Sequence, residues 1–593
     1  MKRWLVAAGI AAGWLGLGAS PALAAGSATV GTLRPVGTVS LRSLPAKPMS
    51  PHALGSGGLG ARVRLADPLD RLEADATASA AGFPTPSPFS VVNTPDRQGW
   101  EGITNLEQEL APGNGSFAVE PPDQGLCAGA YKGQTLVFES VNLALQVYDR
   151  HGDQLLPGAV ALNQFFGLAP EVDQQGNFGP FVSDPKCYFD PQTHRWFHTA
   201  LESSFDPKTG ALLPPASTLL AVSASQDPLG AYHLYRIPAT DFGGPNCPCF
   251  GDQPLIGADQ YGVYINTSEY SMQQSRSNFA QLYAMPKLAL EAGQPLRFVH
   301  FRNLTTTALN GRTTATIQPA FTDAPGQNQL ANNGTEYLLS GFDCVPVTCD
   351  LTKGSFNKIT FWALTNTRSL QTRHPALRLS RQLLTVGRYV NPPWQFQKPG
   401  PTPFGCNPNL GADCHTPPVE ANDVRMNQVV YSHGRLWSGI NTGVGPGKRV
   451  GIEYFIIKPA ASGHARARVA RSGYVSAAGE NVSFPSVGVN AAGRGVIAFS
   501  LMGHAYYPSA AYVPVGVNGA RGPIHVVASG FRPEDGFTCY KKPFGFGPPC
   551  RWGDYSASVA GPDGTIWSGT EWIGPHARDT YANWSTFIFP IKP

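Results

Sequence analysis

One short pattern recurs along most of this chain: a β-strand, a turn of Asp, Gly, His or Asn, and then a strand that carries an aromatic residue. This order is typical of a β-hairpin, because such residues tolerate tight turns while the flanking residues favour strands. Clear examples are Val147–Asp153, Tyr188–Trp196, Tyr431–Trp437, Val489–Val496 and Val559–Trp567. The hairpins return roughly every 40–70 residues, and such spacing with several strands per repeat is typical of β-propeller blades.

The hairpins divide most of the chain into repeating units, which we interpret as blades. These are 117–150, 181–237, 250–300, 314–366, 420–458, 472–515 and 551–592. Six or eight blades also remain open, because proline-rich insertions near 367–419 and 516–550 show little periodicity. A pair of β-sandwiches would show similar strands and turns, but the spacing favours a propeller. We therefore predict an all-β fold, a β-propeller with seven blades, over residues 116–593.

Composition supports short strands and predicts little helix. The 593 residues include 66 Gly and 54 Pro, and only 14% are charged, as expected for many strands joined by turns. Residues 25–115 differ, since they are rich in Ala, Gly, Pro and Ser and show no sustained alternation. We expect a flexible leader there, with a short helix near Asp67–Ala78 as its one candidate element.

Residues 1–24 have the features of an export signal. Lys2 and Arg3 precede an apolar run, and Ala22-Leu23-Ala24 supplies the small residues at a cleavage site. We expect a secreted, extracellular protein without a membrane span, because no stretch reaches the roughly 18 apolar residues that a spanning helix needs. The formal net charge of +4 without a basic cluster argues against a nucleic-acid partner. We also expect a monomer.

The ten cysteines are more consistent with disulfides than with metal thiolates, since an exported chain meets an oxidising compartment. Local spacing predicts the pairs Cys344–Cys349, Cys406–Cys414 and Cys539–Cys550. Four cysteines then remain and allow three pairings, of which we favour Cys127–Cys187. A zinc site at Cys247 and Cys249 is the rival interpretation, but no His/Cys pair with the usual spacing accompanies them.

An aspartate stands near the start of most proposed blades, next to Pro, Gly or a tight turn. These residues are Asp123, Asp184, Asp252, Asp323, Asp423 and Asp554. Because the first strand of each blade lines the channel of a propeller, the carboxylates would converge there and bind a polar ligand or a cation. Ca²⁺, held by Asp184, Asp252 and Asp554, is the natural candidate. The alternative is that each Asp caps its own turn.

Arginine and aromatic residues accompany two of these aspartates. Arg425 follows Asp423, while Arg551, Trp552 and Tyr555 surround Asp554. Arginine beside an aromatic ring suits recognition of sugars or carboxylates through stacking and paired hydrogen bonds. The same residues also serve as ordinary packing and anchoring groups in strands.

Several motifs together resemble a group of secreted, mostly uncharacterised bacterial β-propeller-like proteins. The matching segments are 121–125 (PPDQG), 183–185 (SDP), 188–190 (YFD), 195–196 (RW), 227–232 (DPLGAY), 551–556 (RWGDYS) and 583–584 (NW). The resemblance covers roughly 117–592 and implies a propeller outside the cell, but no enzymatic activity. A weaker likeness, to the Asp-box turns of sialidase-type propellers, lies at Asp563–Trp567 and concerns the fold alone.

Familiar catalytic motifs are missing, including His-Glu-x-x-His, Gly-x-Ser-x-Gly and a phosphate-binding loop. We therefore assign no catalytic residues and favour a non-catalytic binding module for a glycan, a peptide or a cell-envelope component. The alternative is a propeller glycoside hydrolase or lyase that acts on polysaccharide. Hydrolysis would need two carboxylates about 5–10 Å apart, which Asp184, Asp252, Asp554 and Glu571 could supply. A structural role in a surface layer ranks third.

Overall fold

The computed structural model describes most of the chain. The described residues are 28–47, 82–94, 98–114, 119–173, 177–206, 212–242, 244, 246–273, 277–306, 313–314, 316–343, 355–406, 414–445, 448–541, 547–576 and 581–593. The predicted signal peptide, the candidate helix at Asp67–Ala78 and the pair Cys344–Cys349 lie outside these residues.

Antiparallel sheets build the protein, and each follows the order of the chain. The first contains β5 (Gly125–Tyr131), β6 (Gln134–Val141), β7 (Ala144–Asp149) and β8 (Val160–Ala161). The second contains β9 (Phe181–Asp190), β10 (Arg195–Phe205), β11 (Leu212–Ser223) and β12 (Ala231–Pro238). The third contains β13 (Cys249–Ala258), β14 (Gly262–Ser271), β15 (Ser277–Pro286) and β16 (Leu296–Leu304).

An eight-stranded sheet follows and consists of two antiparallel runs joined by a parallel pair. One run is β17 (Gln318–Phe321), β18 (Thr335–Ser340), β19 (Ser355–Thr365) and β20 (Arg378–Val390). The other is β21 (Val429–Ser432), β22 (Arg435–Val444), β23 (Arg449–Pro459) and β24 (Ala467–Val475). β17 and β21 are the parallel pair.

Two further sheets complete the molecule. One contains β25 (Glu480–Val489), β26 (Arg494–Gly503), β27 (Ser509–Gly516), β28 (Gly519–Ala520) and β29 (Ile524–Ala528). The other contains β30 (Ala557–Ala560), β31 (Ile566–Trp572) and β32 (Ser585–Ile591). The short helices are η1 (Leu41–Ser43), α2 (Asn105–Leu110), α3 (Leu162–Phe165), α4 (Lys287–Glu291), η4 (Thr367–Gln371) and η6 (Phe537–Cys539).

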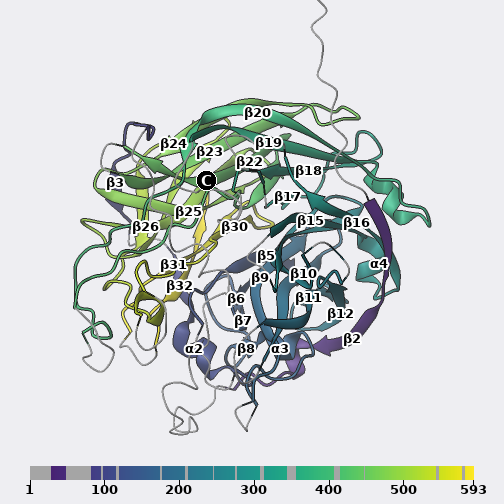
Figure 1. Cartoon of the computed structure of the whole chain (residues 1–593), viewed down its shortest axis with the longest axis horizontal. Helices are drawn as coiled ribbons and strands as arrows, with labels where there is room; N and C mark the ends of the chain where they lie inside the picture. The colour runs from purple at the N-terminus through teal and green to yellow at the C-terminus, as the bar shows by residue number, and fades with distance from the viewer. Residues whose placement is uncertain are drawn as a thin grey trace, which may run out of the picture.

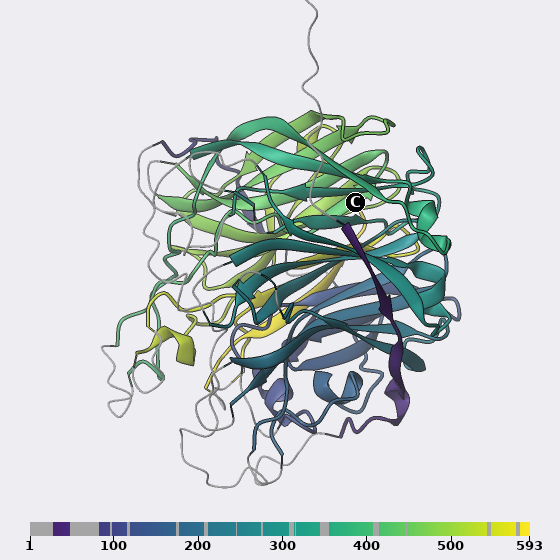
Figure 2. The same cartoon turned by 45° about the vertical axis from the view of Figure 1, so that its right-hand side comes forward.

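The first strands of these units form a closed ring. β5 contacts β9, β9 contacts β13, β13 contacts β17, and β17 pairs with β21. β21 then contacts β25, β25 contacts β30, and β30 returns to β5. The sheets accordingly surround a central axis in Figure 1, and Figure 2 shows the same sheets stacked face to face. The predicted all-β propeller is confirmed, whereas the number of blades depends on dividing the eight-stranded sheet in two, so seven remains a prediction.

The structure differs from the sequence prediction in the segment 25–115. There β1 (Ala28–Leu33) pairs with β16, β2 (Pro35–Ser40) pairs with β12, and β3 (Val91–Asn93) pairs with β29. β4 (Trp100–Thr104) pairs with β32 and leads into α2. The described parts of the expected flexible leader therefore form outer strands. β1 and β2 are largely exposed, so they lack the alternation of buried and exposed residues that would have revealed them.

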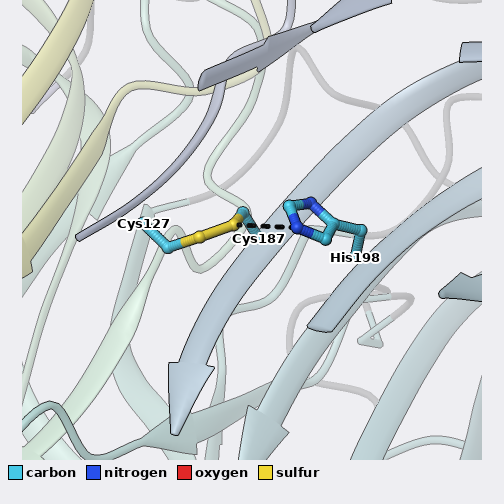
Figure 3. Close-up of side chains that lie close together, drawn as sticks. All are labelled: Cys127, Cys187 and His198. Carbon is cyan, nitrogen blue, oxygen red and sulfur yellow. Dashed lines mark hydrogen bonds between the residues drawn. A yellow bond between two sulfur atoms is a disulfide. The ribbon is translucent and has the colours of Figure 1, made fainter. Parts of the chain in front are cut away.

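Disulfides join distant and neighbouring parts of the ring. Cys127 of β5 bonds Cys187 of β9, as favoured from the sequence, and the buried His198 of β10 lies beside this bond in Figure 3. Cys539–Cys550 also forms as predicted, and Cys247 bonds Cys249, which removes the zinc interpretation for the oxidised protein. The prediction of Cys406–Cys414 is wrong, because these exposed residues are not bonded to one another.

No helix among the described residues is long and apolar enough to cross a membrane.

Candidate functional site

A cavity lies on the axis of the ring, where the first strands meet. Water-sized molecules can fill about 40 Å³ of this cavity, within a space of about 560 Å³ that includes the part open to solvent. Its polar lining is rich in amides and comprises Gln124, Lys186, Gln253, Gln318, Arg425, Asn427, Gln428, Tyr555 and Ser556. Apolar side chains such as Leu126, Ile256 and Phe321 complete the wall. A mixed wall of this kind is typical of small-ligand sites.

Left-handed backbone recurs at the start of the blades, beside this cavity. Asp123, Asp184, Gln253 and Asn422 have φ values of 47°, 53°, 51° and 57°. A positive φ is uncommon for residues other than glycine, and Asp and Asn adopt it most readily. Because such strained conformations cluster at functional sites, their repetition at the first strands supports this part of the ring as the site.

Asparagines hold these left-handed segments from the neighbouring blade. Asn142, next to β6, accepts a hydrogen bond from the backbone N–H of Asp184 at 2.8 Å and donates to the carboxylate of Asp123 at 2.7 Å. Asn441 of β22 likewise accepts from the N–H of Phe484 at 2.8 Å and donates to the carbonyl of Ala421 at 2.7 Å. These buried side chains therefore connect consecutive blades at the channel.

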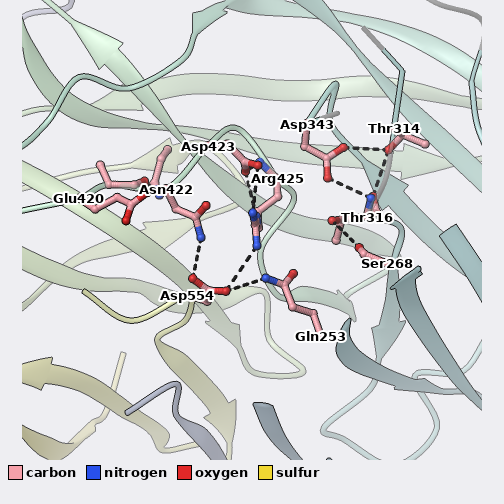
Figure 4. A network of polar contacts seen from close by, with 12 residues as sticks. Gln253, Ser268, Thr314, Thr316, Asp343, Glu420, Asn422, Asp423, Arg425 and Asp554 are labelled. Atoms are coloured by element: carbon pink, nitrogen blue, oxygen red, sulfur yellow. Dashed lines mark hydrogen bonds and ion pairs between the residues drawn. The ribbon is translucent and has the colours of Figure 1, made fainter. Parts of the chain in front are cut away.

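Asp554 is the centre of the polar network (Figure 4). Its Oδ2 accepts hydrogen bonds from Gln253 at 2.6 Å and from Arg425 at 3.4 Å. Its Oδ1 accepts from Asn422 at 2.7 Å and from Arg551 at 3.2 Å. Four donors from three parts of the chain thus converge on one carboxylate that is 7% exposed.

Each arginine of this network also holds a second carboxylate. Arg425 contacts both oxygens of Asp423, at 2.9 and 3.1 Å, and Arg551 contacts Glu420 at 3.0 Å. The backbone N–H of Asp554 donates to Asp123 at 2.6 Å, which adds a further carboxylate to the cluster. The arginines therefore compensate charges that would otherwise repel one another in a buried place.

Two groups near the axis titrate close to neutral pH. Burial, followed by the charge of Asp554, raises the pKa of Asp123 to about 6. Burial lowers the pKa of Lys186 to about 7, although the nearby carboxylates of Asp184, Asp123 and Asp554 act in the opposite direction. The Lys186 ammonium lies 2.8 Å from the centre of the Tyr555 ring and donates to the carbonyl of Gln124. Groups of this kind exchange protons readily at neutral pH.

The predicted aspartates gather in part. Asp123, Asp184, Asp252 and Asp554 all lie near Tyr555, since their charges act together with burial to raise the pKa of its hydroxyl. Asp423 joins them through Arg425. Asp323 does not, because it accepts a hydrogen bond from the N–H of Ala560, at the other end of β30 from Asp554. Burial raises the pKa of Asp323 to about 7.

The predicted ligand-binding groups divide in the same way. Arg425 and Tyr555 line the cavity. Arg551 lies behind it, held by Glu420 and Asp554. Trp552 does not line the cavity, and its buried indole donates to Ser500 at 3.0 Å. It packs in the apolar core, which is the alternative weighed for it from the sequence.

Sequence reasoning missed most of the amides and the lysine of the cavity wall. Gln124 and Gln253 directly follow predicted aspartates, and Lys186 comes two residues after Asp184. Since a strand presents side chains alternately, the residues after each Asp were the available signal. Asn422 and Glu420 gave no signal, because their partners Asp554 and Arg551 lie far away in the sequence.

The aspartates do not fit the calcium site expected from the sequence. Both oxygens of Asp554 already accept hydrogen bonds from side chains. Within the described residues, Asp184, Asp252 and Asp554 do not form a group with ligand atoms within 4.8 Å of one another. The cations that balance this cluster are Arg425, Arg551 and Lys186, which belong to the protein itself.

A second cavity lies at the rim, between β4, α2 and β32, and water-sized molecules can fill about 350 Å³ of it. Its charged residues already have local partners: Glu101 pairs with His576, and Glu107 caps α2 through Thr104. The axial cavity is the stronger candidate, because it combines strained backbone, buried charges and groups that titrate near neutral pH.

No family model and no curated protein matches this chain. Among solved structures, an ulvan lyase of polysaccharide lyase family PL25 is similar at a TM-score of 0.35 and 9% identity, over 84% of this chain and 96% of that one. An exo-β-1,3-galactanase from Clostridium thermocellum gives 0.27 and 9%, over 80% and 97%. The endosialidase of phage phi92 gives 0.29 and 7%, over 68% and 66%. Likeness this weak carries no argument about chemistry, so the assignment to the β-propellers rests on the strand topology.

Proposed function

We propose that this protein is an extracellular binding propeller that takes a hydroxylated ligand, such as a sugar unit of a glycan, in its axial cavity. The observation that carries the proposal is a set of polar atoms around the cavity without a hydrogen-bond partner in the described part of the chain: Gln124 Oε1, Gln253 Oε1, Tyr555 Oη and Ser556 Oγ. Buried polar atoms are normally hydrogen-bonded, so hydroxyl groups of a ligand would satisfy them at this position.

The charges around the cavity also favour a polyhydroxylated ligand over a highly charged one. Carboxylates stand behind the wall, while Arg425 and Lys186 stand within it, so either sign of strong charge would meet repulsion. Amides and hydroxyls both donate and accept, which suits a neutral sugar. The predicted signal peptide and cleavage after Ala24 supply the extracellular location in this proposal.

A glycan array probed with the labelled protein tests the proposal, followed by calorimetry with each glycan that binds. Tyr555→Phe removes one hydroxyl at the cavity and should weaken binding about tenfold, the effect of one lost hydrogen bond of about 1.4 kcal/mol. The matched control is Tyr474→Phe, whose hydroxyl donates to the Arg388 carbonyl outside the cavity. Equal affinity of the two variants for a bound glycan would contradict an axial site.

Cleavage of polysaccharide is the second candidate, and one observation favours it. Asp123, with a pKa raised to about 6, and Lys186, with a pKa lowered to about 7, could donate and accept protons at neutral pH. Incubation with acidic and neutral polysaccharides, followed by assays for new reducing ends and for unsaturated ends, separates hydrolysis from elimination. If activity is found, Lys186→Met and Asp123→Asn should abolish it, whereas Tyr474→Phe should not.

A further inference from the structure

The bond between Cys247 and Cys249 stands apart from the other disulfides of the described chain. Only one residue separates the two cysteines, against sequence separations of 60 for Cys127–Cys187 and 11 for Cys539–Cys550. A disulfide stabilises a fold mainly by restricting the unfolded chain, and the effect grows with the length of the loop. A disulfide between Cys247 and Cys249 therefore contributes little to the stability of the fold, and its presence needs another explanation.

The exposure of the two sulfurs is unequal. Cys249, the first residue of β13, is completely buried, whereas Cys247 is partly exposed at the preceding turn. An external thiol can thus reach one sulfur while the other stays inside the protein. Both residues of Cys127–Cys187 and of Cys539–Cys550 are buried, so those bonds offer no comparable point of attack.

Polar groups converge on the buried side of this bond. The amide of Asn278 donates to Cys249 Sγ at 3.1 Å and to Cys247 Sγ at 3.3 Å. The carboxylate of Glu269, on the neighbouring strand β14, has an oxygen within 4.8 Å of both sulfurs. A donor stabilises the negative charge of a thiolate, and a protonated carboxyl group can supply its proton.

The surroundings of Glu269 keep its proton available. Burial, followed by the charge of Asp241, raises its pKa to about 8, while Arg302 acts in the opposite direction. Gln281 of β15 donates to its carboxylate at 2.5 Å, and His300 of β16 bonds that same glutamine. Tyr283 also faces it, since the charge of Glu269 contributes to the raised pKa of this phenol.

We propose that Cys247–Cys249 is a redox-active disulfide that oxidises external thiols, with Cys247 as the attacked sulfur and Glu269 as the proton donor to Cys249. A thiolate attacks Cys247 Sγ, the Cys247–Cys249 bond breaks, and its electron pair goes to Cys249 Sγ, which takes the proton of Glu269. A second external thiolate then attacks the external sulfur of the mixed disulfide and releases Cys247 as a thiolate. Cys247 and Glu269 then take up the two protons that the external thiols released to water, so two thiols become one disulfide and the protein becomes a dithiol.

The test follows each disulfide of the full chain in glutathione buffers of increasing reducing strength. Acid quenching, alkylation with N-ethylmaleimide and peptide mass spectrometry report which bond has opened. Cys247–Cys249 should open at least tenfold faster than Cys539–Cys550. A second arm replaces glutathione with a reduced peptide that contains two cysteines, and faster reaction with the peptide would identify a polypeptide thiol as the substrate. Reaction no faster than that of Cys539–Cys550 in both arms would overturn the proposal.

Two matched substitutions test the proton donor. Glu269→Gln should slow the opening of Cys247–Cys249 about tenfold at neutral pH, and the difference from the wild type should vanish above about pH 9, where Glu269 has lost its proton. Glu453→Gln is the control, because burial also raises the pKa of Glu453 to about 8. The carboxylate of Glu453 accepts a hydrogen bond from the backbone of Gly387 and lies away from this disulfide. Equal rates for the two variants would refute the assignment of Glu269.

Discussion

Replacing Asp554 with Asn should destabilise the protein more than any conservative change in a surface turn. The carboxylate accepts from Gln253, Asn422, Arg425 and Arg551, two donors on each oxygen. An amide of the same size keeps one acceptor oxygen and turns an NH₂ group toward the other two donors. Depending on how the amide is turned, either Arg425 and Gln253 or Arg551 and Asn422 then lose their acceptor.

The magnitude follows from these two lost bonds. Hydrogen bonds to a charged group contribute about 1.5–3 kcal/mol each, so their loss costs about 3–6 kcal/mol. Part of this is offset, because Arg425 keeps Asp423, Arg551 keeps Glu420, and Asp123 no longer faces the charge of Asp554. We expect a net decrease of about 3 kcal/mol in the free energy of unfolding.

Urea unfolding followed by tryptophan fluorescence measures this decrease. Asp563→Asn provides the comparison, because the exposed Asp563 accepts from the N–H and the hydroxyl of Thr565 in a hairpin turn. Its loss should cost about 0.5–1.5 kcal/mol, the usual net contribution of a hydrogen bond. If Asp554→Asn costs no more than Asp563→Asn, the network does not hold the channel together and the reasoning fails.

Three further predictions concern pH and the disulfides. Burial lowers the pKa of His198 to about 3, so between pH 6.5 and about pH 3 the unfolded state binds more protons than the folded state. The free energy of unfolding should therefore fall by up to about 1.4 kcal/mol per pH unit as the pH falls through that range. His198→Phe keeps the packing against Phe138 and should flatten this pH dependence in urea unfolding, whereas parallel curves for the variant and the wild type would contradict it. Because the pKa of Lys186 is lowered from 10.5 to about 7, the unfolded state again binds more protons between these values, and stability should rise with pH there in the wild type but not in Lys186→Met. Replacing both cysteines of a pair by Ser should lower the free energy of unfolding by about 4 kcal/mol for Cys127–Cys187 and by about 3 kcal/mol for Cys539–Cys550, because their sequence separations are 60 and 11. A higher denaturation midpoint for the variant without Cys127–Cys187 than for the variant without Cys539–Cys550 would refute this argument from chain entropy.

The sequence predicted the strands of the blades because strand-forming residues and turn residues follow one another regularly along the chain. β22 and β26 combine apolar residues with turn residues at each end, and the structure has both as nearly fully buried central strands. β1, β2 and β3 escaped prediction for the opposite reason. They are outer strands with mostly solvent-exposed side chains, so their pairing is decided by the free edges of distant strands and not by their own pattern.

The sequence could predict which residues of the candidate site lie near the start of a strand, but not which residues they contact. Asp123 and Asp554 precede first strands and Asp184 lies in the first half of one, and the closed ring then brings them to the axis. Their partners were not predictable, because contact between Gln253 and Asp554 spans 301 residues of sequence. Asp323 follows its strand β17 instead of preceding it, and it therefore lies at the other end of the channel.

The left-handed residues and the asparagines that hold them fix the positions of the polar side chains at this site. Each positive φ at Asp123, Asp184 and Asn422 costs free energy that the local sequence alone does not recover. Some of the bonds that recover it come from the neighbouring blade, as in the contact of Asn142 with Asp184, while Asn142 also holds Asp123 of its own blade. Formation of the site therefore requires the blades to be closed into a ring, and in an open array the same residues would have no reason to adopt this conformation. Local strain, buried charge and contact between blades coincide at one end of the axis, and that coincidence is the expected signature of a site maintained for binding or chemistry rather than for stability.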